Sequence, residues 1–64
     1  MTLLSVIIVN LNGEKYLPDC LDALASQTFR DFEVIVVDNG SRDGSLRLLK
    51  ERFPWVKVIS LSEN

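Results

Sequence analysis

Apolar residues form three short runs along the chain. The runs cover 3–9, 32–37 and 56–59, and the first two are almost uninterrupted and rich in β-branched residues. Runs of this kind are typical of strands that are covered on both faces of a parallel sheet. The third run alternates with Lys57, which predicts a shorter strand nearer an edge of the sheet.

Between the first two runs the apolar spacing changes to three and four residues, which indicates one face of a helix. The residues on this face are Leu17, Cys20, Leu21, Leu24 and Ala25. Proline is tolerated in the first turn of a helix, so Pro18 predicts a helix that begins near Glu14 or Lys15. Because Cys20 belongs to the apolar face, we expect a core residue there and not a nucleophile.

A second helix is predicted between the second and third apolar runs. Its expected buried face carries Leu46, Leu49 and Phe53, and Pro54 ends it. Ser41 or Asp43 is expected to cap its N-terminus.

This alternation predicts an α/β fold. We expect a three-layer βαβαβ Rossmann-like half-domain with a parallel sheet in the strand order 3-2-1, because crossover connections are right-handed. The chain has 64 residues, of which 47% are hydrophobic and 25% charged, so it forms at most one small globular domain. A domain of this size buries about 60% of its unfolded surface, and its stability is expected to be marginal.

Charge and composition exclude several classes of function. The net charge is −2 and the basic residues are scattered, which argues against nucleic-acid binding. The absence of histidine argues against a His-based zinc site or catalytic relay. No apolar run is long enough to span a bilayer, and the lone Cys20 indicates a reducing compartment, so a cytoplasmic protein is expected.

Ligands of open parallel sheets bind beyond the carboxyl ends of the strands. Two polar stretches, 9–12 and 38–41, follow the first two strands, and amide or carboxylate groups there can hydrogen-bond the edge of a pyrimidine base. Gly40 allows a positive φ or a close ligand. The same residues are also typical of simple turns, so a turn with no ligand stays an alternative.

Two other nucleotide- or phosphate-dependent classes do not fit. A dinucleotide-binding unit needs a glycine-rich turn after the first strand, whereas residues 10–14 contain one glycine and one acid. A phosphate-accepting receiver domain has an acidic pair near its first strand, where this chain has Asn10 and Asn12.

Residues 5–45, SVIIVNLNGEKYLPDCLDALASQTFRDFEVIVVDNGSRDGS, resemble the start of the inverting family 2 glycosyltransferases, which have the GT-A fold. The form DNGS in place of DDGS is similar to a rhamnosyltransferase-like subset. The resemblance implies that residues 1–64 are the N-terminal nucleotide-sugar-binding portion of a longer enzyme. Such an enzyme transfers a sugar from a UDP- or dTDP-sugar to an acceptor hydroxyl with inversion, and a role in cell-surface polysaccharide biosynthesis is expected.

The resemblance also implies the nucleotide-binding residues, which are Val9, Asn10, Leu11, Asp38 and Asn39. Val9 and Leu11 match positions that contact the base, and Asn39 matches the position that accepts the N3–H of uracil or thymine. Asp38 is expected to shape and cap the corner. Leu11 replaces an aromatic residue and Asn39 replaces an acid, so base stacking is lost and the charge is absent.

The remaining machinery of such an enzyme is expected outside these residues. The sequence contains no Asp-x-Asp motif, so the ligands of the divalent metal (Mg or Mn) and the catalytic carboxylate are not in this chain. We therefore expect no activity from the 64 residues alone. The full enzyme is expected in the cytoplasm or at the inner face of the membrane.

Strand 3–9 is expected to expose an unpaired edge, which predicts self-association of the chain. Two alternatives to the enzyme remain open. One is a non-catalytic nucleotide-binding module, and the other is a structural or interaction domain of the α/β class.

Overall fold

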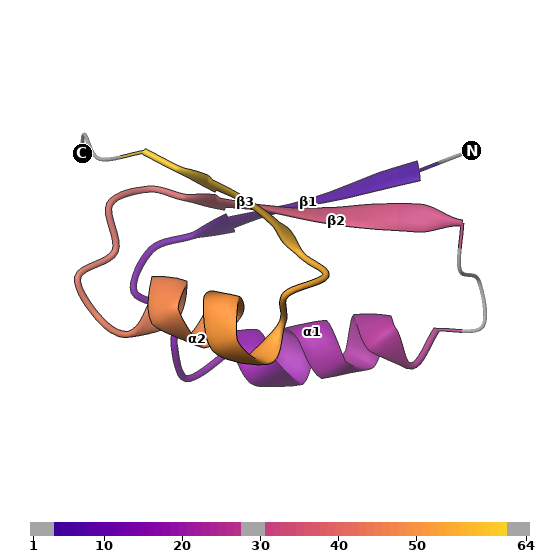
Figure 1. Cartoon of the computed structure of the whole chain (residues 1–64), viewed down its shortest axis with the longest axis horizontal. Helices are drawn as coiled ribbons and strands as arrows, with labels where there is room; N and C mark the ends of the chain where they lie inside the picture. The colour runs from indigo at the N-terminus through magenta and orange to yellow at the C-terminus, as the bar shows by residue number, and fades with distance from the viewer. Residues whose placement is uncertain (1–3, 28–30, 62–64) are drawn as a thin grey trace.

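The computed structural model describes residues 4–27 and 31–61. Within these residues the chain alternates strands and helices, and Figure 1 shows them in a sheet with helices beneath it. The elements are β1 (Leu4–Asn10), α1 (Leu17–Ala25), β2 (Phe32–Asp38), α2 (Ser45–Arg52) and β3 (Lys57–Ser60).

The sheet has the order β1-β2-β3, and both pairings are parallel. The predicted order 3-2-1 is therefore confirmed. The register places Asn10 opposite Asp38, and Asp38 opposite Ser60, so all three strands end along one edge of the sheet. β3 is the shortest strand and lies at an edge, as its alternating pattern predicted.

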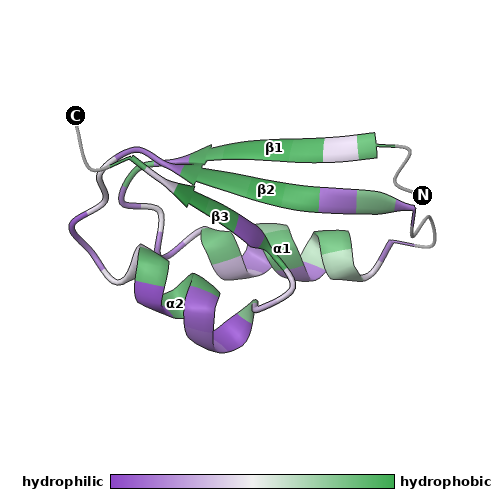
Figure 2. Ribbon diagram, turned by 45° about the horizontal axis from the view of Figure 1, so that its top comes forward, coloured by the Kyte–Doolittle hydropathy of each residue, from purple (hydrophilic) through white to green (hydrophobic). Residues whose placement is uncertain are grey.

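Both helices lie on the same face of the sheet (Figure 1), so the described residues supply two of the three expected layers. The prediction that both faces of strand 3–9 are covered does not hold within them. Val9 is 72% exposed and Ile7 is 55% exposed, because they point away from the helices. Figure 2 shows that β1 is nonetheless hydrophobic along most of its length, so an apolar sheet face stays open.

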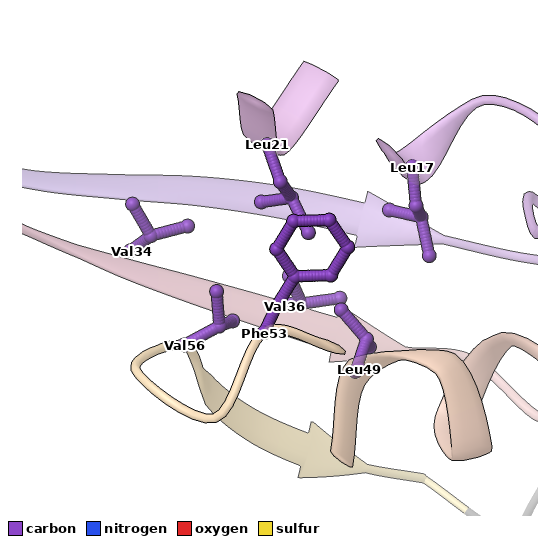
Figure 3. Packing of buried hydrophobic residues seen from close by; sticks show 7 residues of the cluster. All are labelled: Leu17, Leu21, Val34, Val36, Leu49, Phe53 and Val56. Atoms are coloured by element: carbon purple, nitrogen blue, oxygen red, sulfur yellow. The ribbon is translucent and has the colours of Figure 1, made fainter. Parts of the chain in front are cut away.

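The core lies between the sheet and the helices. Figure 3 shows its side chains converging from α1, β2 and the α2–β3 region; they are Leu17, Leu21, Val34, Val36, Leu49, Phe53 and Val56. Val6 and Ile8 of β1 pack against this cluster and are partly buried. Alternate residues of β1 and β2 therefore face the helices, as expected for strands with one covered face.

α1 begins at Leu17, later than the predicted start near Glu14 or Lys15. A turn precedes it, in which the N–H groups of Tyr16 and Leu17 both donate to the carbonyl of Gly13 at 2.9 Å. Pro18 lies in the first helical turn, as expected.

The expectation that Cys20 is a core residue is wrong, because its side chain is exposed. A helix turns about 100° per residue, so Leu17, Leu21 and Leu24 cluster about one direction while Cys20 and Ala25 lie at its two margins. Cys20 lies beside the free edge of β1, where the described residues place no further strand.

The buried face of α2 also differs from the prediction at one position. Leu49 and Phe53 are buried as expected, but Leu46 is 37% exposed and Ser45 is fully buried instead. Ser45 begins the helix and donates both its N–H and its hydroxyl to Asp43, so its polar groups are satisfied. A buried serine at a helix start needs such a partner.

Candidate functional site

Two loops meet at the carboxyl edge of the sheet. Residues 11–16 follow β1 and residues 39–44 follow β2, and both strands end at the same side of the molecule (Figure 1). Parallel pairing of β1 with β2 brings the loops together, because their last residues, Asn10 and Asp38, are register partners.

Asp38 lies at the centre of this corner and is almost fully buried. Its carboxylate accepts hydrogen bonds from Asn10 Nδ2 at 2.7 Å, from the Ser41 hydroxyl at 2.6 Å and from the Ser41 N–H at 3.0 Å. Burial raises the pKa of Asp38, but the hydrogen bonds from Ser41 and Asn10 outweigh burial and hold it below its usual value. Asp38 is therefore an ionised group that organises the turn.

Asn12 links the two loops through both its backbone and its side chain. Its N–H donates to Ser41 Oγ at 2.8 Å, and its Oδ1 accepts from the Arg42 N–H at 2.7 Å and the Asp43 N–H at 3.3 Å. The backbone of Asn12 is left-handed, with φ 53°. Asparagine tolerates this region better than most residues with a side chain.

Glu14 makes two contacts with the second loop, one with Asp43 and one with Gly44. The Glu14 N–H donates to Asp43 Oδ2 at 3.1 Å, and the Gly44 N–H donates to Glu14 Oε1 at 2.9 Å. Asp43 also accepts from the hydroxyl and the N–H of Ser45, at the start of α2. The hydrogen bond from the Ser45 hydroxyl lowers the pKa of Asp43. The exposed carboxylate of Asp43 therefore stays ionised. The N-cap of α2 is Gly44 and not Ser41 or Asp43 as predicted; Asp43 precedes the cap and accepts the N–H of Ser45, the first residue of the helix.

The predicted base-binding residues lie around one rim, but they do not line one hollow. Val9, Asn10 and Leu11 line a hollow beside α1. Asp38 instead lines a separate hollow on the side of β3. Asn39 lies between these regions, and its N–H donates to the carbonyl of Asn10 at 2.9 Å.

Exposure separates the predicted residues into three groups. Val9 and Leu11 are 72% and 56% exposed, so their side chains are open to solvent. Asn10 and Asp38 are buried and bonded to each other. Asn39 is half-buried and contributes its backbone N–H to the corner.

Sequence reasoning missed the part that Asn12 and Glu14 play in the corner. Both side chains belong to the loop after β1, yet they bind backbone N–H groups of the loop after β2. The sequence did contain a signal for these contacts. Polar residues with acceptor oxygens follow β1, and a turn with unpaired backbone N–H groups is expected after β2. The partners could be identified only from the tertiary structure.

The corner does not suit a divalent metal. Both oxygens of Asp38 accept hydrogen bonds from Asn10 and Ser41, and both oxygens of Asp43 accept them from Ser45 and Glu14. Across residues 4–27 and 31–61, no three acidic or sulfur-bearing side chains gather as a metal site would need.

In the same ranges, neither helix is long and apolar enough to cross a membrane.

Comparison with known proteins gives a consistent family. The family model described as Glycosyl transferase family 2 matches residues 5–64. The chondroitin synthase of Escherichia coli is 39% identical over 61 residues, which are 91% of this chain and 9% of that protein. A PGL/p-HBAD biosynthesis glycosyltransferase of Mycobacterium tuberculosis is 52% identical over 42 residues, which are 66% of this chain and 16% of that protein.

A solved structure is similar over the whole fold. The crystal structure of S. aureus TarS 1–349 superimposes with a TM-score of 0.86 and 38% sequence identity, and the match covers 100% of this chain and 20% of that one. The chain thus spans between 9% and 20% of the length of these three relatives.

Proposed function

Because this chain belongs to glycosyl transferase family 2, we propose that it is the N-terminal nucleotide-binding portion of a longer glycosyltransferase. That enzyme transfers a sugar from a UDP- or dTDP-sugar to an acceptor hydroxyl with inversion. The observation that carries the proposal is the corner at the ends of β1 and β2. There the buried pair of Asn10 and Asp38 fixes the backbone on either side of Asn39.

In this proposal the residues of the rim have separate tasks. The Asn39 side-chain oxygen accepts the N3–H of uracil or thymine, which a neutral amide can do as well as a carboxylate. The exposed side chain of Leu11 contacts the face of the base, and the backbone beside Val9 and Leu11 contacts its edge. Asp38 does not touch the base, because its carboxylate is buried and bonded to Asn10 and Ser41.

The chemical step is assigned to other parts of the longer enzyme. The residues of this corner do not fit the Mg or Mn ion expected for the family, and the carboxylates of Asp38 and Asp43 are engaged in hydrogen bonds. We therefore propose that the chain binds the donor base and that the purified 64 residues show no turnover. Transfer or donor hydrolysis by this chain would contradict the assignment.

The decisive experiment is a nuclear magnetic resonance titration of the chain with UDP, dTDP and CDP. UDP and dTDP are expected to shift the amide signals of Asn39 and Leu11. The variant Asn39→Ala removes the acceptor and is expected to weaken UDP binding about two- to tenfold, the value of one hydrogen bond. Asn39→Asp keeps an acceptor and is the matched control.

CDP sharpens the test, because N3 of cytosine is itself an acceptor. The carboxylate of Asn39→Asp cannot donate a hydrogen bond to N3 of cytosine. This variant is therefore expected to bind UDP more tightly than CDP. A titration in which no nucleotide shifts Asn39 would contradict the proposal and favour a structural or interaction domain. Nucleotide binding in a full-length protein that lacks transferase activity would favour a non-catalytic module.

The remaining predictions concern the pathway, the cellular location and the glycosyltransferase subset. The relatives named above act, by their names, in chondroitin and PGL/p-HBAD biosynthesis. These names support the proposed role in cell-surface polysaccharide biosynthesis. The location in the cytoplasm or at the inner face of the membrane stays a prediction. The rhamnosyltransferase-like likeness of DNGS stays a prediction.

We also propose that the isolated chain associates with itself. Among the described residues β1 pairs with β2 alone, so its other edge offers unpaired N–H and C=O groups. The exposed side chains of Ile7 and Val9 add apolar surface beside that edge. Pairing of two β1 edges would satisfy the backbone groups and bring the apolar side chains of the two strands side by side on the open face.

A further inference from the structure

Side chains of the loop after β1 accept hydrogen bonds from backbone N–H groups of the loop after β2. Asn12 Oδ1 accepts the N–H groups of Arg42 and Asp43, and Glu14 Oε1 accepts that of Gly44. These three consecutive N–H groups precede α2, so without external acceptors they would be left to water. We call Asn12, Glu14 and their contacts with residues 42–44 the loop brace.

Directly before the residues held by the loop brace, a two-residue segment lies between anchored positions. Asp38 ends β2, and Ser41 is bound by Asp38, by Asn10 and by the Asn12 N–H. Only Asn39 and Gly40 lie between these anchors. Gly40 has φ 80°, which glycine adopts without strain, but glycine is conformationally free, so neighbouring contacts must hold this turn in one conformation.

The brace lies apart from the hydrophobic core. The side chains of Asn12 and Glu14 are exposed, and their acceptors bind backbone groups at the surface. The core is formed instead by residues of α1, β2 and α2 with Phe53 and Val56, between the sheet and the helices. Loss of a brace contact should therefore loosen the loop more than it destabilises the fold.

From these contacts we propose that Asn12 and Glu14 are positioning residues for the nucleotide base. They do not touch the base; they hold residues 42–44, directly after Ser41, so that the turn carrying Asn39 is already ordered when the nucleotide arrives. Pre-organisation of this kind raises affinity because less conformational freedom is lost on binding. The inference rests on the proposed function, since it needs Asn39 to be the residue that meets the base.

The test uses a variant that leaves the backbone geometry intact. Asn12→Gly removes the Oδ1 acceptor while glycine adopts φ 53° freely. Asn12→Asp keeps an oxygen at the same position and is the conservative variant expected to restore function. Glu14→Ala removes the contact with Gly44 and provides a second, exposed site.

A matched control removes a similar surface contact far from the corner. Ser26→Ala deletes the hydroxyl that donates to the Asp22 carbonyl at 3.0 Å, near the end of α1. For each variant three quantities are measured: the unfolding midpoint, the hydrogen-exchange rates of the amides at 42–44, and the Kd for UDP in the folded chain.

Asn12→Gly and Glu14→Ala are expected to speed exchange at 42–44 and to raise the Kd for UDP about three- to tenfold. Asn12→Asp and Ser26→Ala are expected to stay within twofold of the parent. Faster exchange with an unchanged Kd would overturn the positioning role while leaving the proposed function intact. Absence of UDP binding in the parent chain would overturn both, and unchanged exchange rates would refute the brace itself.

Discussion

Asn10 and Asp38 are the residues on which the corner depends. They face each other in the register of β1 and β2, both are buried, and Asn10 Nδ2 donates to Asp38 Oδ1 at 2.7 Å. A buried carboxylate is costly unless it is hydrogen-bonded, and Ser41 supplies the remaining donors. The side chain of Asp38 thus acts on the fold of the loop, whereas Asn39 is free to act on a ligand.

Gly13 is expected to be irreplaceable beside this pair. A Cβ at position 13 would lie 2.3 Å from Asn10 Oδ1, and the hydrogen bonds to Asp38 and Ser41 prevent Asn10 from moving away. Gly13→Ala should lower the free energy of unfolding by about 1–3 kcal/mol, as overpacking does.

Gly44→Ala is the control for this substitution. Its Cβ would meet only the end of the Glu14 side chain, which is exposed and can rotate away. Urea denaturation of both variants measures the difference. An equal loss of stability in the two would contradict the rigid position of Asn10.

Asp38 predicts the response of the chain to acid. Its folded pKa is depressed, so its contribution to the free energy of unfolding is complete above the unfolded pKa of about 3.9. That contribution is lost as the pH falls through the lower folded pKa, because protonation then favours the unfolded chain. Urea unfolding midpoints measured from pH 7 down to about 2.5 record this loss of stability.

The variant Asp38→Asn isolates this effect. It is expected to be less stable than the parent by about 1–3 kcal/mol at pH 7, since it replaces an acceptor oxygen with a donor. The two stability curves should converge at acid pH, where the parent has lost the charge of Asp38. Curves that stay parallel over the whole range would show that Asp38 carries no part of the acid response.

At the scale of the elements, α2 is fixed by few contacts. Leu49 is 1% exposed and lies in the core cluster, and Phe53 follows it one turn later. Arg47 and Glu51 form an exposed ion pair at 3.2 Å, which adds little stability. The helix is therefore held by its apolar face and by the polar contacts of Asp43 and Ser45 at its start.

Leu49 and Leu46 were predicted on the same buried face, and the structure separates them. Leu49→Ala is expected to cost about 2–5 kcal/mol, the range for a buried leucine, and to leave much of this small chain unfolded. Leu46→Ala, at a position 37% exposed, should cost about 1 kcal/mol at most. Circular dichroism during urea titration compares the two, and equal effects would place Leu46 in the core.

At the scale of the whole molecule, one face of the sheet is open. The helices cover one face, while the other presents an apolar row in which Val9 pairs with Val37 and Val37 with Ile59. Exposed apolar rows beside an unpaired strand edge are typical of surfaces that bind another chain segment. This surface is the physical reason to expect that the isolated chain does not stay monomeric.

Self-association is expected to depend on the edge of β1. Sedimentation velocity should show a sedimentation coefficient that rises with concentration in the parent chain. Ile7→Lys, which places a charge on the edge strand, is expected to restore the monomer, because lysine on an edge opposes pairing. Leu46→Lys, on exposed α2, is the control that should leave association unchanged. A monomer at every concentration would refute the proposal.

The sequence by itself determined the elements, their order and the place of the corner. Periodicity distinguishes strands from helices, and right-handed crossovers between sequential neighbours predict the order β3-β2-β1, which brings residues 9–12 beside 38–41. Contacts between neighbouring turns, such as Asp43 with Ser45, were within reach because their partners are close in sequence.

Only the tertiary structure decided which side chains face the core and which loops bind each other. Cys20 and Leu46 lie at the margins of apolar stripes, where a small rotation of a helix exchanges burial for exposure. Asn12 binds Arg42 across 30 residues of sequence, and no local pattern specifies that pairing. Such contacts depend on the register between β1 and β2, which is set by the packing of the whole sheet and not by either loop.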